Sequence, residues 1–142
     1  MAAILSVVFL LFEGSYLVAL AASYDNSLET LMGDMKITAH RGGALMAPEN
    51  TVSALKSSIE CGADMAEIDV QETGDGKLIL LHDDSLKRTA GVKKKVWEMK
   101  LAEIKKLDAG TSFHERYRGE KIPTLEEVLD FLQRKAGLKH RD

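Results

Sequence analysis

Two apolar runs separated by a short polar segment constrain the fold of this chain most strongly. Residues 65–70 (MAEIDV) are followed, after six residues, by residues 77–81 (KLILL). Parallel strands need a crossover of about a dozen residues or more, so two strands this close must fold back on each other as an antiparallel hairpin. Asp75 and Gly76 form a strong two-residue turn signal, because both central residues of a type I′ turn need positive φ.

The turn predicts a register for the hairpin. With Asp75 and Gly76 at the turn, Asp69 lies opposite His82. Side chains alternate along a strand, so Glu67, Asp69 and His82 are expected to share one face. A slip of two residues would place Glu67 opposite His82 and keep the same face. The other face is expected to carry Ile68, Val70, Ile79 and Leu81.

A strand and a helix are expected before the hairpin. Residues 36–39 are typical of a short strand that ends at His40, and an apolar periodicity predicts a helix over 48–61. Strand, helix and strand at this spacing indicate a parallel βαβ unit. Further along, residues 101–107 predict a short helix, and Thr124 with Glu127 forms the capping box of a final helix.

Five chemically distinctive side chains are expected near one rim of the sheet. His40 and Arg41 close a strand parallel to the one that carries Glu67 and Asp69, and ligands bind at this rim in α/β proteins. Histidine titrates near neutral pH, so His40 and His82 suit general acid–base catalysis. The planar guanidinium of Arg41 suits phosphate oxygens. Together these residues predict metal-assisted phosphoryl transfer.

Glu67 and Asp69 are the expected metal ligands. Two carboxylates on one face of an apolar strand repel each other and lose solvation unless a positive charge lies between them. Oxygen ligands favour Mg²⁺ or Ca²⁺ over Zn²⁺, which prefers His or Cys. The alternative interpretation of the Glu-x-Asp spacing is a pair of carboxylates at a solvated strand end.

The N-terminal segment differs in character from the rest. Residues 2–22 are almost entirely apolar and approach the roughly 20 residues of a membrane-spanning helix. No Lys or Arg precedes them, which favours a retained hydrophobic helix over a cleaved signal peptide. We expect a membrane-associated protein with its folded part outside the cytoplasm; a secreted protein and a buried soluble helix are the alternatives. Residues 1–35 are therefore assigned to a hydrophobic segment and linker, and residues 36–142 to the folded domain.

Composition and length exclude several classes of protein. Nineteen Lys and Arg against 22 Asp and Glu give a net charge of -3, so nucleic-acid binding, which needs a cationic surface, is not expected. The single cysteine, Cys61, excludes an intramolecular disulfide and a multi-cysteine zinc site. A complete (β/α)8 barrel typically takes about 250 residues. A chain of 142 residues is too short to form one.

Ordered motifs over residues 36–133 resemble the glycerophosphodiester phosphodiesterase family. The resemblance rests on their order and matching spacing. The motifs are His40-Arg41-Gly42-Gly43, Ala47-Pro48-Glu49-Asn50-Thr51, Gly62-Ala63-Asp64, Glu67-Ile68-Asp69-Val70, Thr73-Gly74-Asp75-Gly76, His82-Asp83 and Leu86-Lys87-Arg88-Thr89.

The resemblance implies a TIM-barrel enzyme of lipid metabolism that hydrolyses glycerophosphodiesters to glycerol 3-phosphate and an alcohol. By position, His40 and His82 would be the acid/base pair, Arg41 a phosphate contact, and Glu67 and Asp69 the ligands of Mg²⁺ or Ca²⁺. The expected fold class is α/β: a truncated TIM-barrel-like (β/α) fold with a β-hairpin after the second strand, preceded by an N-terminal hydrophobic helix. Further family strands, one with another carboxylate ligand, would follow, so a fragment or a degenerate copy with impaired activity is expected.

Two other functions stay open at this point. One is a non-catalytic, membrane-anchored module that binds a metal or a phosphodiester without hydrolysing it. The other is a phosphodiesterase like the phosphoinositide phospholipases, which share the strand and hairpin arrangement. Glu49, Asn50 and Thr51 match the family motif, but a role at a helix start explains them equally well, so no chemistry is assigned to them.

Overall fold

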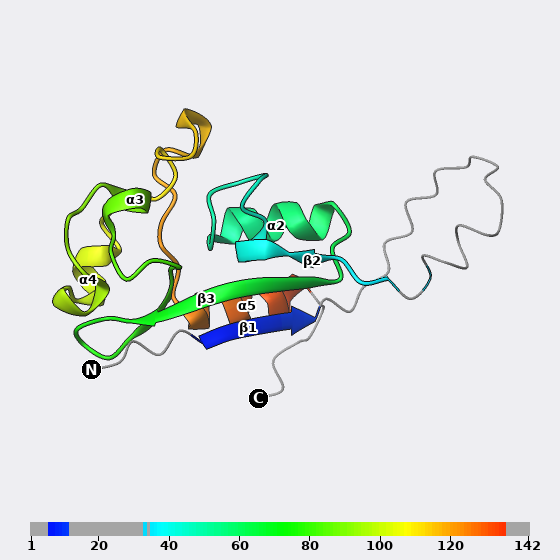
Figure 1. Ribbon diagram of the computed structural model, residues 1–142, viewed down its shortest axis with the longest axis horizontal. Helices are drawn as coiled ribbons and strands as arrows, with labels where there is room; N and C mark the ends of the chain where they lie inside the picture. The colour runs from blue at the N-terminus through cyan, green and yellow to red at the C-terminus, as the bar shows by residue number, and fades with distance from the viewer. Residues whose placement is uncertain (1–5, 12–32, 34, 136–142) are drawn as a thin grey trace.

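The computed structural model describes residues 6–11, 33 and 35–135 (Figure 1). One four-stranded sheet contains β1 (Ser6–Leu11), β2 (Thr38–Ala39), β3 (Met65–Glu72) and β4 (Leu78–Leu80). The α-helices are α2 (Val52–Glu60), α3 (Lys87–Ala90), α4 (Leu101–Ile104) and α5 (Leu125–Lys135). Short 3₁₀ turns form η1 (His40–Gly42), η2 (Val96–Glu98) and η3 (Glu115–Tyr117).

Strand β3 organises the sheet because it pairs along both of its edges. β2 runs parallel to it, with Thr38 opposite Met65, which confirms the predicted parallel β2–α2–β3 unit. Val70 pairs both with Ser6 of β1 and with Leu80 of β4. Since one residue has one partner on each edge, β1 lies on one edge of β3, and β2 and β4 share the other.

The predicted hairpin is present, but its register differs from the prediction by one residue. Val70 pairs with Leu80, and Glu72 pairs with Leu78. The backbone N–H of Thr73 donates to the Lys77 carbonyl at 2.9 Å, so three residues make the loop. Gly76 has φ 74°, whereas Asp75 is not in the left-handed region, which excludes a type I′ turn. The loop instead has the glycine at its last position, as three-residue hairpin loops do.

A shift of one residue moves side chains to the opposite face of a strand. The prediction placed Ile79 and Leu81 on the same face as Ile68 and Val70. In the structure these two residues lie on the opposite face, and Leu80 shares the face of Ile68 and Val70. Two separate clusters of buried apolar side chains result. One consists of Leu55, Ala66, Ile68, Val70, Leu80 and Val128. The other consists of Ile79, Leu81, Leu86, Val96, Met99, Ile104, Ala109 and Ile122.

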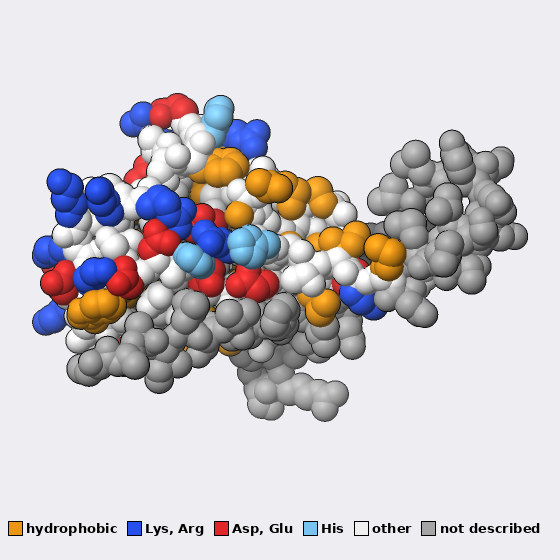
Figure 2. Space-filling model, in the orientation of Figure 1, with side chains coloured by type: hydrophobic (Ala, Val, Ile, Leu, Met, Phe, Trp, Pro, Cys, Tyr) orange, Lys and Arg blue, Asp and Glu red, His pale blue; other side chains and the backbone are white. Residues whose placement is uncertain are grey.

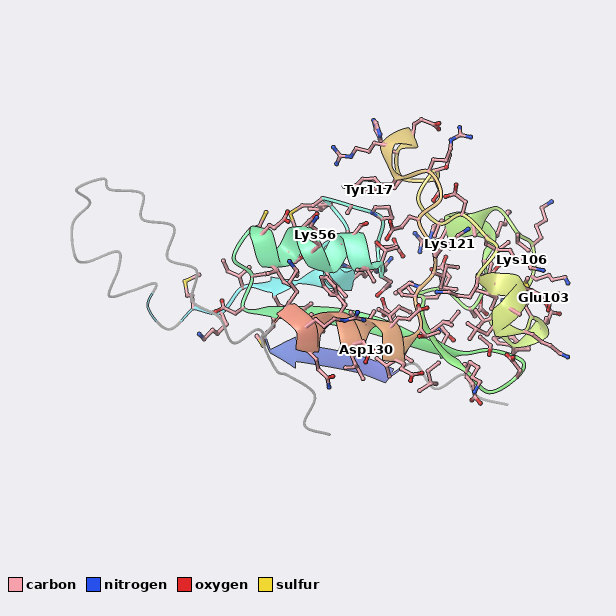
Figure 3. All side chains as sticks on the ribbon, turned by 180° about the vertical axis from the view of Figure 1, so that it is seen from behind. Lys56, Glu103, Lys106, Tyr117, Lys121 and Asp130 are labelled. Atoms are coloured by element: carbon pink, nitrogen blue, oxygen red, sulfur yellow. The ribbon has the colours of Figure 1, made fainter. Side chains whose placement is uncertain are left out.

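Helices α2 and α5 pack on the face of β3 that carries Ile68 and Val70. The view from behind shows both helices on this side of the sheet, with Lys56 on α2 and Asp130 on α5 (Figure 3). Helix α2 begins at Val52 rather than Pro48, because the Thr51 hydroxyl caps it by accepting from the Ala54 N–H at 3.2 Å. Glu67 and Asp69, which alternate with the apolar residues of β3, are left on the other face.

The predicted capping box of the final helix, α5, is confirmed. The Glu127 N–H donates to Thr124 Oγ1 at 3.1 Å, and the Thr124 N–H donates to Glu127 Oε2 at 2.9 Å, which is the predicted capping box. The helix predicted over 101–107 is also present, though α4 is only Leu101–Ile104.

The hydrophobic helix predicted within residues 2–22 is wrong for Ser6–Leu11, which form strand β1. This strand pairs with β3 over six positions, from Ser6 opposite Val70 to Leu11 opposite Met65. An unpaired edge of β3 offers a row of backbone donors and acceptors, and an apolar segment that contains Val7, Val8 and Phe9 can bond to it. The other residues of 2–22 lie outside the described part of the chain. No helix among the described residues has the length and apolar character needed to span a membrane.

Candidate functional site

The loop after β2 brings His40 and Arg41 to the rim of the sheet. The side chain of His40 is exposed at the point where β2 ends. Arg41 has φ 48° and ψ 42°, a left-handed conformation that is uncommon and costly for a residue with a long side chain. Its backbone N–H donates to Glu67 Oε2 at 2.6 Å. The carboxylate of Glu67 therefore stabilises the strained turn, and the predicted residues Arg41 and Glu67 lie together.

The guanidinium of Arg41 lies between two acidic side chains. Its Nη1 donates to Glu49 Oε1 at 3.2 Å, and its Nε is 4.0 Å from Asp69 Oδ2. That Nε is buried and has no hydrogen-bond partner among the described residues. An unpaired buried donor is costly. Arg41 is thus held in place by carboxylates, and its buried Nε makes no hydrogen bond among the described residues.

Asp69 is 2% exposed and is fixed by Asn50. Asn50 Nδ2 donates to Asp69 Oδ2 at 2.9 Å, and Asn50 Oδ1 accepts from the Asp69 N–H at 3.1 Å. Asn50 has φ 56°, in the left-handed region that asparagine tolerates better than most residues. Its own N–H donates to the Arg41 carbonyl at 2.9 Å. Asn50 therefore ties Asp69 to the Arg41 loop.

His82 enters the site differently from the prediction. The Leu81 N–H donates to the Asp69 carbonyl at 3.0 Å, so Leu81, not His82, lies opposite Asp69. No hydrogen bond or ion pair joins His82 to Glu67 or Asp69 in the described part of the chain. Gln71, on the same face of β3 as Asp69, donates to the His82 carbonyl at 3.2 Å. His82 is thus anchored to that face through its backbone, just beyond the end of β4.

A chain of charged groups connects His82 to Arg41. His82 Nδ1 is 2.8 Å from Asp83 Oδ1, and Arg88 contacts Asp83 through Nε at 2.8 Å. Arg88 also bonds both oxygens of Glu49, each at 2.7 Å. Glu49 in turn bonds Arg41. Figure 2 shows histidine side chains among acidic and basic ones in the middle of this face, over the end of β2 and the middle of β3.

These contacts perturb the ionisation of the group. Hydrogen bonds from Arg88 lower the pKa of Asp83 to about 2, with His82 adding to the effect. Arg88 also lowers the pKa of Glu49, against the opposing effect of burial. The two carboxylates raise the pKa of Arg88 above its ordinary value, Glu49 having the larger effect. All three groups are therefore charged at neutral pH.

The two predicted metal ligands fit a hard cation in their chemistry. Glu67 and Asp69 are two residues apart on one face of β3, and each has one carboxylate oxygen, Glu67 Oε1 and Asp69 Oδ1, with no hydrogen-bond partner among the described residues. Oxygen donors are those that Mg²⁺ and Ca²⁺ prefer. The described residues contain no group of three His, Cys, Asp or Glu side chains arranged to hold a metal. These two residues can therefore supply part of a coordination sphere.

Four residues of the network were not predicted as functional from the sequence: Glu49, Asn50, Asp83 and Arg88. All four belong to the ordered motifs within residues 36–133. For Asn50 the sequence signal was its place in the motif of residues 47–51; the structure shows that its side chain is polar yet 1% exposed and that its backbone is left-handed. The Glu49–Arg88 pair joins residues 39 positions apart, and no local spacing reveals it.

A separate open groove of about 430 Å³ lies beside α2 and α5, and no predicted site residue lines it. Its cationic side chains are already bonded. Lys105 Nζ is 2.6 Å from Glu127 Oε2, and Lys121 Nζ donates to the carbonyls of Lys106 and Leu107 (Figure 3). We therefore place the candidate site at the network around Arg41 and not in this groove.

Comparison with known proteins gives a consistent set of relatives. The model of the glycerophosphoryl diester phosphodiesterase family matches residues 40–141. A glycerophosphodiester phosphodiesterase of Caldanaerobacter subterraneus subsp. tengcongensis is 48% identical over 96 residues, covering 68% of this chain and 40% of that protein. Human glycerophosphodiester phosphodiesterase 1 is 37% identical over 93 residues, which is 64% of this chain and 28% of that protein.

Solved structures agree with these sequences. A glycerophosphodiester phosphodiesterase of Agrobacterium tumefaciens matches with a TM-score of 0.68 and 40% identity, over 71% of this chain and 44% of that one. An Oleispira antarctica phosphodiesterase in complex with the product sn-glycerol-3-phosphate matches with a TM-score of 0.68 and 39% identity, over 70% of this chain and 40% of that one. The chain thus spans less than half the length of these relatives.

Proposed function

Because the chain belongs to the glycerophosphoryl diester phosphodiesterase family, we propose that it carries part of the active site of an enzyme that hydrolyses glycerophosphodiesters to glycerol 3-phosphate and an alcohol. The single observation that carries this proposal is Arg41, whose guanidinium is held by Glu49 at the rim of the sheet, 4.0 Å from the carboxylate of Asp69. A planar guanidinium presents a fork of N–H donors that suits phosphate oxygens. The product bound to the Oleispira antarctica relative is a phosphate ester of this class.

The roles proposed for the side chains follow from their positions. Arg41 binds the phosphate, and Glu67 with Asp69 would hold Mg²⁺ or Ca²⁺, which supplies a Lewis acid that polarises a phosphoryl oxygen. His40 and His82 are the proton-transfer pair. One takes the proton of the attacking glycerol hydroxyl, whose oxygen bonds to phosphorus, and the other protonates the alcohol as its bond to phosphorus breaks. Water then attacks the cyclic phosphate formed in this way and breaks the bond from that hydroxyl oxygen to phosphorus, which gives glycerol 3-phosphate.

A binding module without turnover is the second candidate function. One observation favours it: among the described residues the Arg41 side chain is held by Glu49 beside Asp69, whereas Glu67 and Asp69 alone supply only part of a coordination sphere. Such a module would bind glycerol 3-phosphate through Arg41 and would not hydrolyse the diester.

One experiment separates the two candidates. Glycerol 3-phosphate released from glycerophosphocholine is measured with Mg²⁺, with Ca²⁺ and with a chelator, next to calorimetric titration of the same protein with glycerol 3-phosphate. Hydrolysis is expected to need the metal and to fall by about 100- to 10,000-fold in His40→Ala, the loss typical of a missing acid or base. His114→Ala, which removes an exposed histidine at the start of η3, serves as the matched control.

The outcomes lead to different conclusions. Saturable binding that Arg41→Ala abolishes, without turnover at any metal concentration, would select the binding module. Neither binding nor turnover in a protein that unfolds cooperatively would remove both candidates. Intact phosphoinositide hydrolysed in preference to glycerophosphoinositol would point to the phospholipase-like activity.

The membrane association and extracytoplasmic location expected for residues 2–22 remain proposals that rest on hydropathy. Strand β1 gives part of this segment another use, because Ser6–Leu11 bond to the sheet. The two uses exclude each other for the same residues at the same time. Deleting the segment therefore distinguishes them, since one use predicts a loss of stability and the other a loss of membrane binding.

A further inference from the structure

Arg88 lies between the two loops of the candidate site. Its Nη1 and Nη2 each bond one oxygen of Glu49 at 2.7 Å, which is the bidentate geometry of a strong arginine–carboxylate pair. Its Nε and Nη2 also bond the two oxygens of Asp83, at 2.8 and 3.0 Å. One guanidinium thus holds a carboxylate from the loop before α2 and a carboxylate from the loop after β4.

The ion pairs of Arg88 have a geometry in which even an exposed pair contributes to stability. Isolated surface ion pairs contribute little, but bidentate pairs and networks of several charges contribute more. The side chain of Arg88 is 48% exposed, whereas that of Glu49 is only 16% exposed and needs a positive partner. Glu49 is shared by Arg88 and Arg41, so both arginines belong to one network.

The orientation of His82 depends on Asp83. Asp83 Oδ1 is 2.8 Å from His82 Nδ1, and the bonds from Arg88 fix both oxygens of Asp83. A carboxylate that stays ionised can only accept hydrogen bonds. The proton of a neutral His82 ring must then be on Nδ1, which leaves Nε2 free to take or, once protonated, to give a proton.

We propose that Arg88 is a positioning residue: through Asp83 it holds His82 in the tautomer with Nε2 free, and through Glu49 it holds the Arg41 side chain at the same time. This inference rests on the proposed function, because it assigns His82 and Arg41 to one reaction. Arg88 contacts neither reacting group directly and acts only through the two carboxylates.

The test reads the tautomer of His82, which needs no turnover. Long-range ¹⁵N–¹H correlation spectra of the full chain are recorded at about pH 9, where histidine is neutral, and His82 is assigned from the signal that His82→Gln removes. Wild-type His82 is expected to carry its proton on Nδ1. In Arg88→Ala the ratio of the Nδ1–H to the Nε2–H form is expected to fall at least about tenfold, because Asp83 loses the bonds that hold its carboxylate against His82 Nδ1.

Two further variants keep the result interpretable. Arg88→Lys keeps the charge but lacks the fork that bonds two carboxylates, so a smaller change in the same direction is expected, and this variant decides the question if Arg88→Ala does not fold. Arg118→Lys is the matched control, because Arg118 pairs with Glu115 outside the network. Its His82 signal is expected to match that of the wild type.

Each result decides one proposal. Wild-type His82 with its proton on Nε2, or a folded Arg88 variant with an unchanged tautomer ratio, would overturn the positioning role. A ratio that changes as expected in a protein without turnover or binding would leave the positioning role intact and remove the proposed function. The positioning role would also be overturned if Arg88→Ala lowered kcat while the tautomer ratio of His82 stayed unchanged.

Discussion

The Asn50 side chain is the sharpest test of how the site is held together. Asn50 makes two hydrogen bonds to Asp69, one to its carboxylate and one from its backbone N–H. It does so from a left-handed backbone conformation, with φ 56°. Replacing it with glycine removes both side-chain bonds and keeps the backbone conformation accessible, whereas replacing it with alanine also strains the backbone.

The magnitudes follow from these contacts. A hydrogen bond to a charged group contributes about 1.5–3 kcal/mol, and a buried donor left without a partner costs about 1–3 kcal/mol. Both hydrogen bonds run between Asn50 and Asp69, so their free-energy contributions are not additive. We expect Asn50→Gly to lower the free energy of unfolding by about 3 kcal/mol. Asn50→Ala is expected to lose about 1 kcal/mol more, the cost of a left-handed alanine. These losses are large against the roughly 5–15 kcal/mol of a typical domain.

Urea unfolding followed by far-ultraviolet circular dichroism measures these differences. Gln133→Ala, which removes an exposed amide from α5, is the control and is expected to change the free energy of unfolding by less than about 0.5 kcal/mol. A loss below about 1 kcal/mol in Asn50→Gly would refute the inference that Asn50 holds Asp69. Equal losses in the glycine and alanine variants would refute the role assigned to the left-handed backbone.

Three further predictions concern other parts of the chain. The pKa of Asp83 is lowered to about 2, so its ionised form stabilises the fold fully above about pH 4. This contribution, about 1 kcal/mol after reduction for the partial exposure of Asp83, is lost as the pH falls towards 2. Asp83→Asn should flatten this part of a stability–pH profile measured by urea unfolding. Gly110→Ala would bring a Cβ into the carbonyl of Tyr117, and we expect its thermal unfolding to show a loss of about 1–3 kcal/mol. Deleting residues 1–11 should lower stability and promote self-association on gel filtration if Ser6–Leu11 occupy the edge of β3, but should only reduce membrane recovery if the segment lies in a bilayer.

The sequence predicted the elements of the fold better than their pairing. Apolar runs and the capping signal placed β3, α2, β4 and α5 within a few residues of their observed bounds. The predicted hairpin register was wrong because this segment fits either a two-residue loop, Asp75-Gly76, or a three-residue loop, Gly74-Asp75-Gly76. The choice between the two loops moves every side chain of β4 to the opposite face. Thr73 Oγ1 accepts from the Lys77 N–H at 3.0 Å and favours the longer loop, a contact that the local pattern does not reveal.

For the site, the sequence identified groups at strand ends and missed those that hold them. The proximity of Arg41 to Glu67 follows from parallel strands ending at one rim, and the structure shows that contact at 2.6 Å. The partners of Asp69 and His82 come from segments whose approach depends on the whole fold. Asn50 lies 19 residues from Asp69, and Glu49 lies 39 residues from Arg88.

The register error leaves the candidate site intact for a physical reason. His82 lies beyond β4 and one residue past Leu81, whose N–H bonds the Asp69 carbonyl, so strand pairing does not hold the His82 side chain. Its backbone is held by Gln71 and its ring by Asp83, and both bonds are made by side chains. The turn of a hairpin determines which residues of the two strands pair, whereas hydrogen bonds made by the Gln71 and Asp83 side chains hold His82 in the site. The two apolar clusters should therefore be sensitive to changes in loop length, and the network from His82 to Arg41 should be sensitive to changes in its carboxylates.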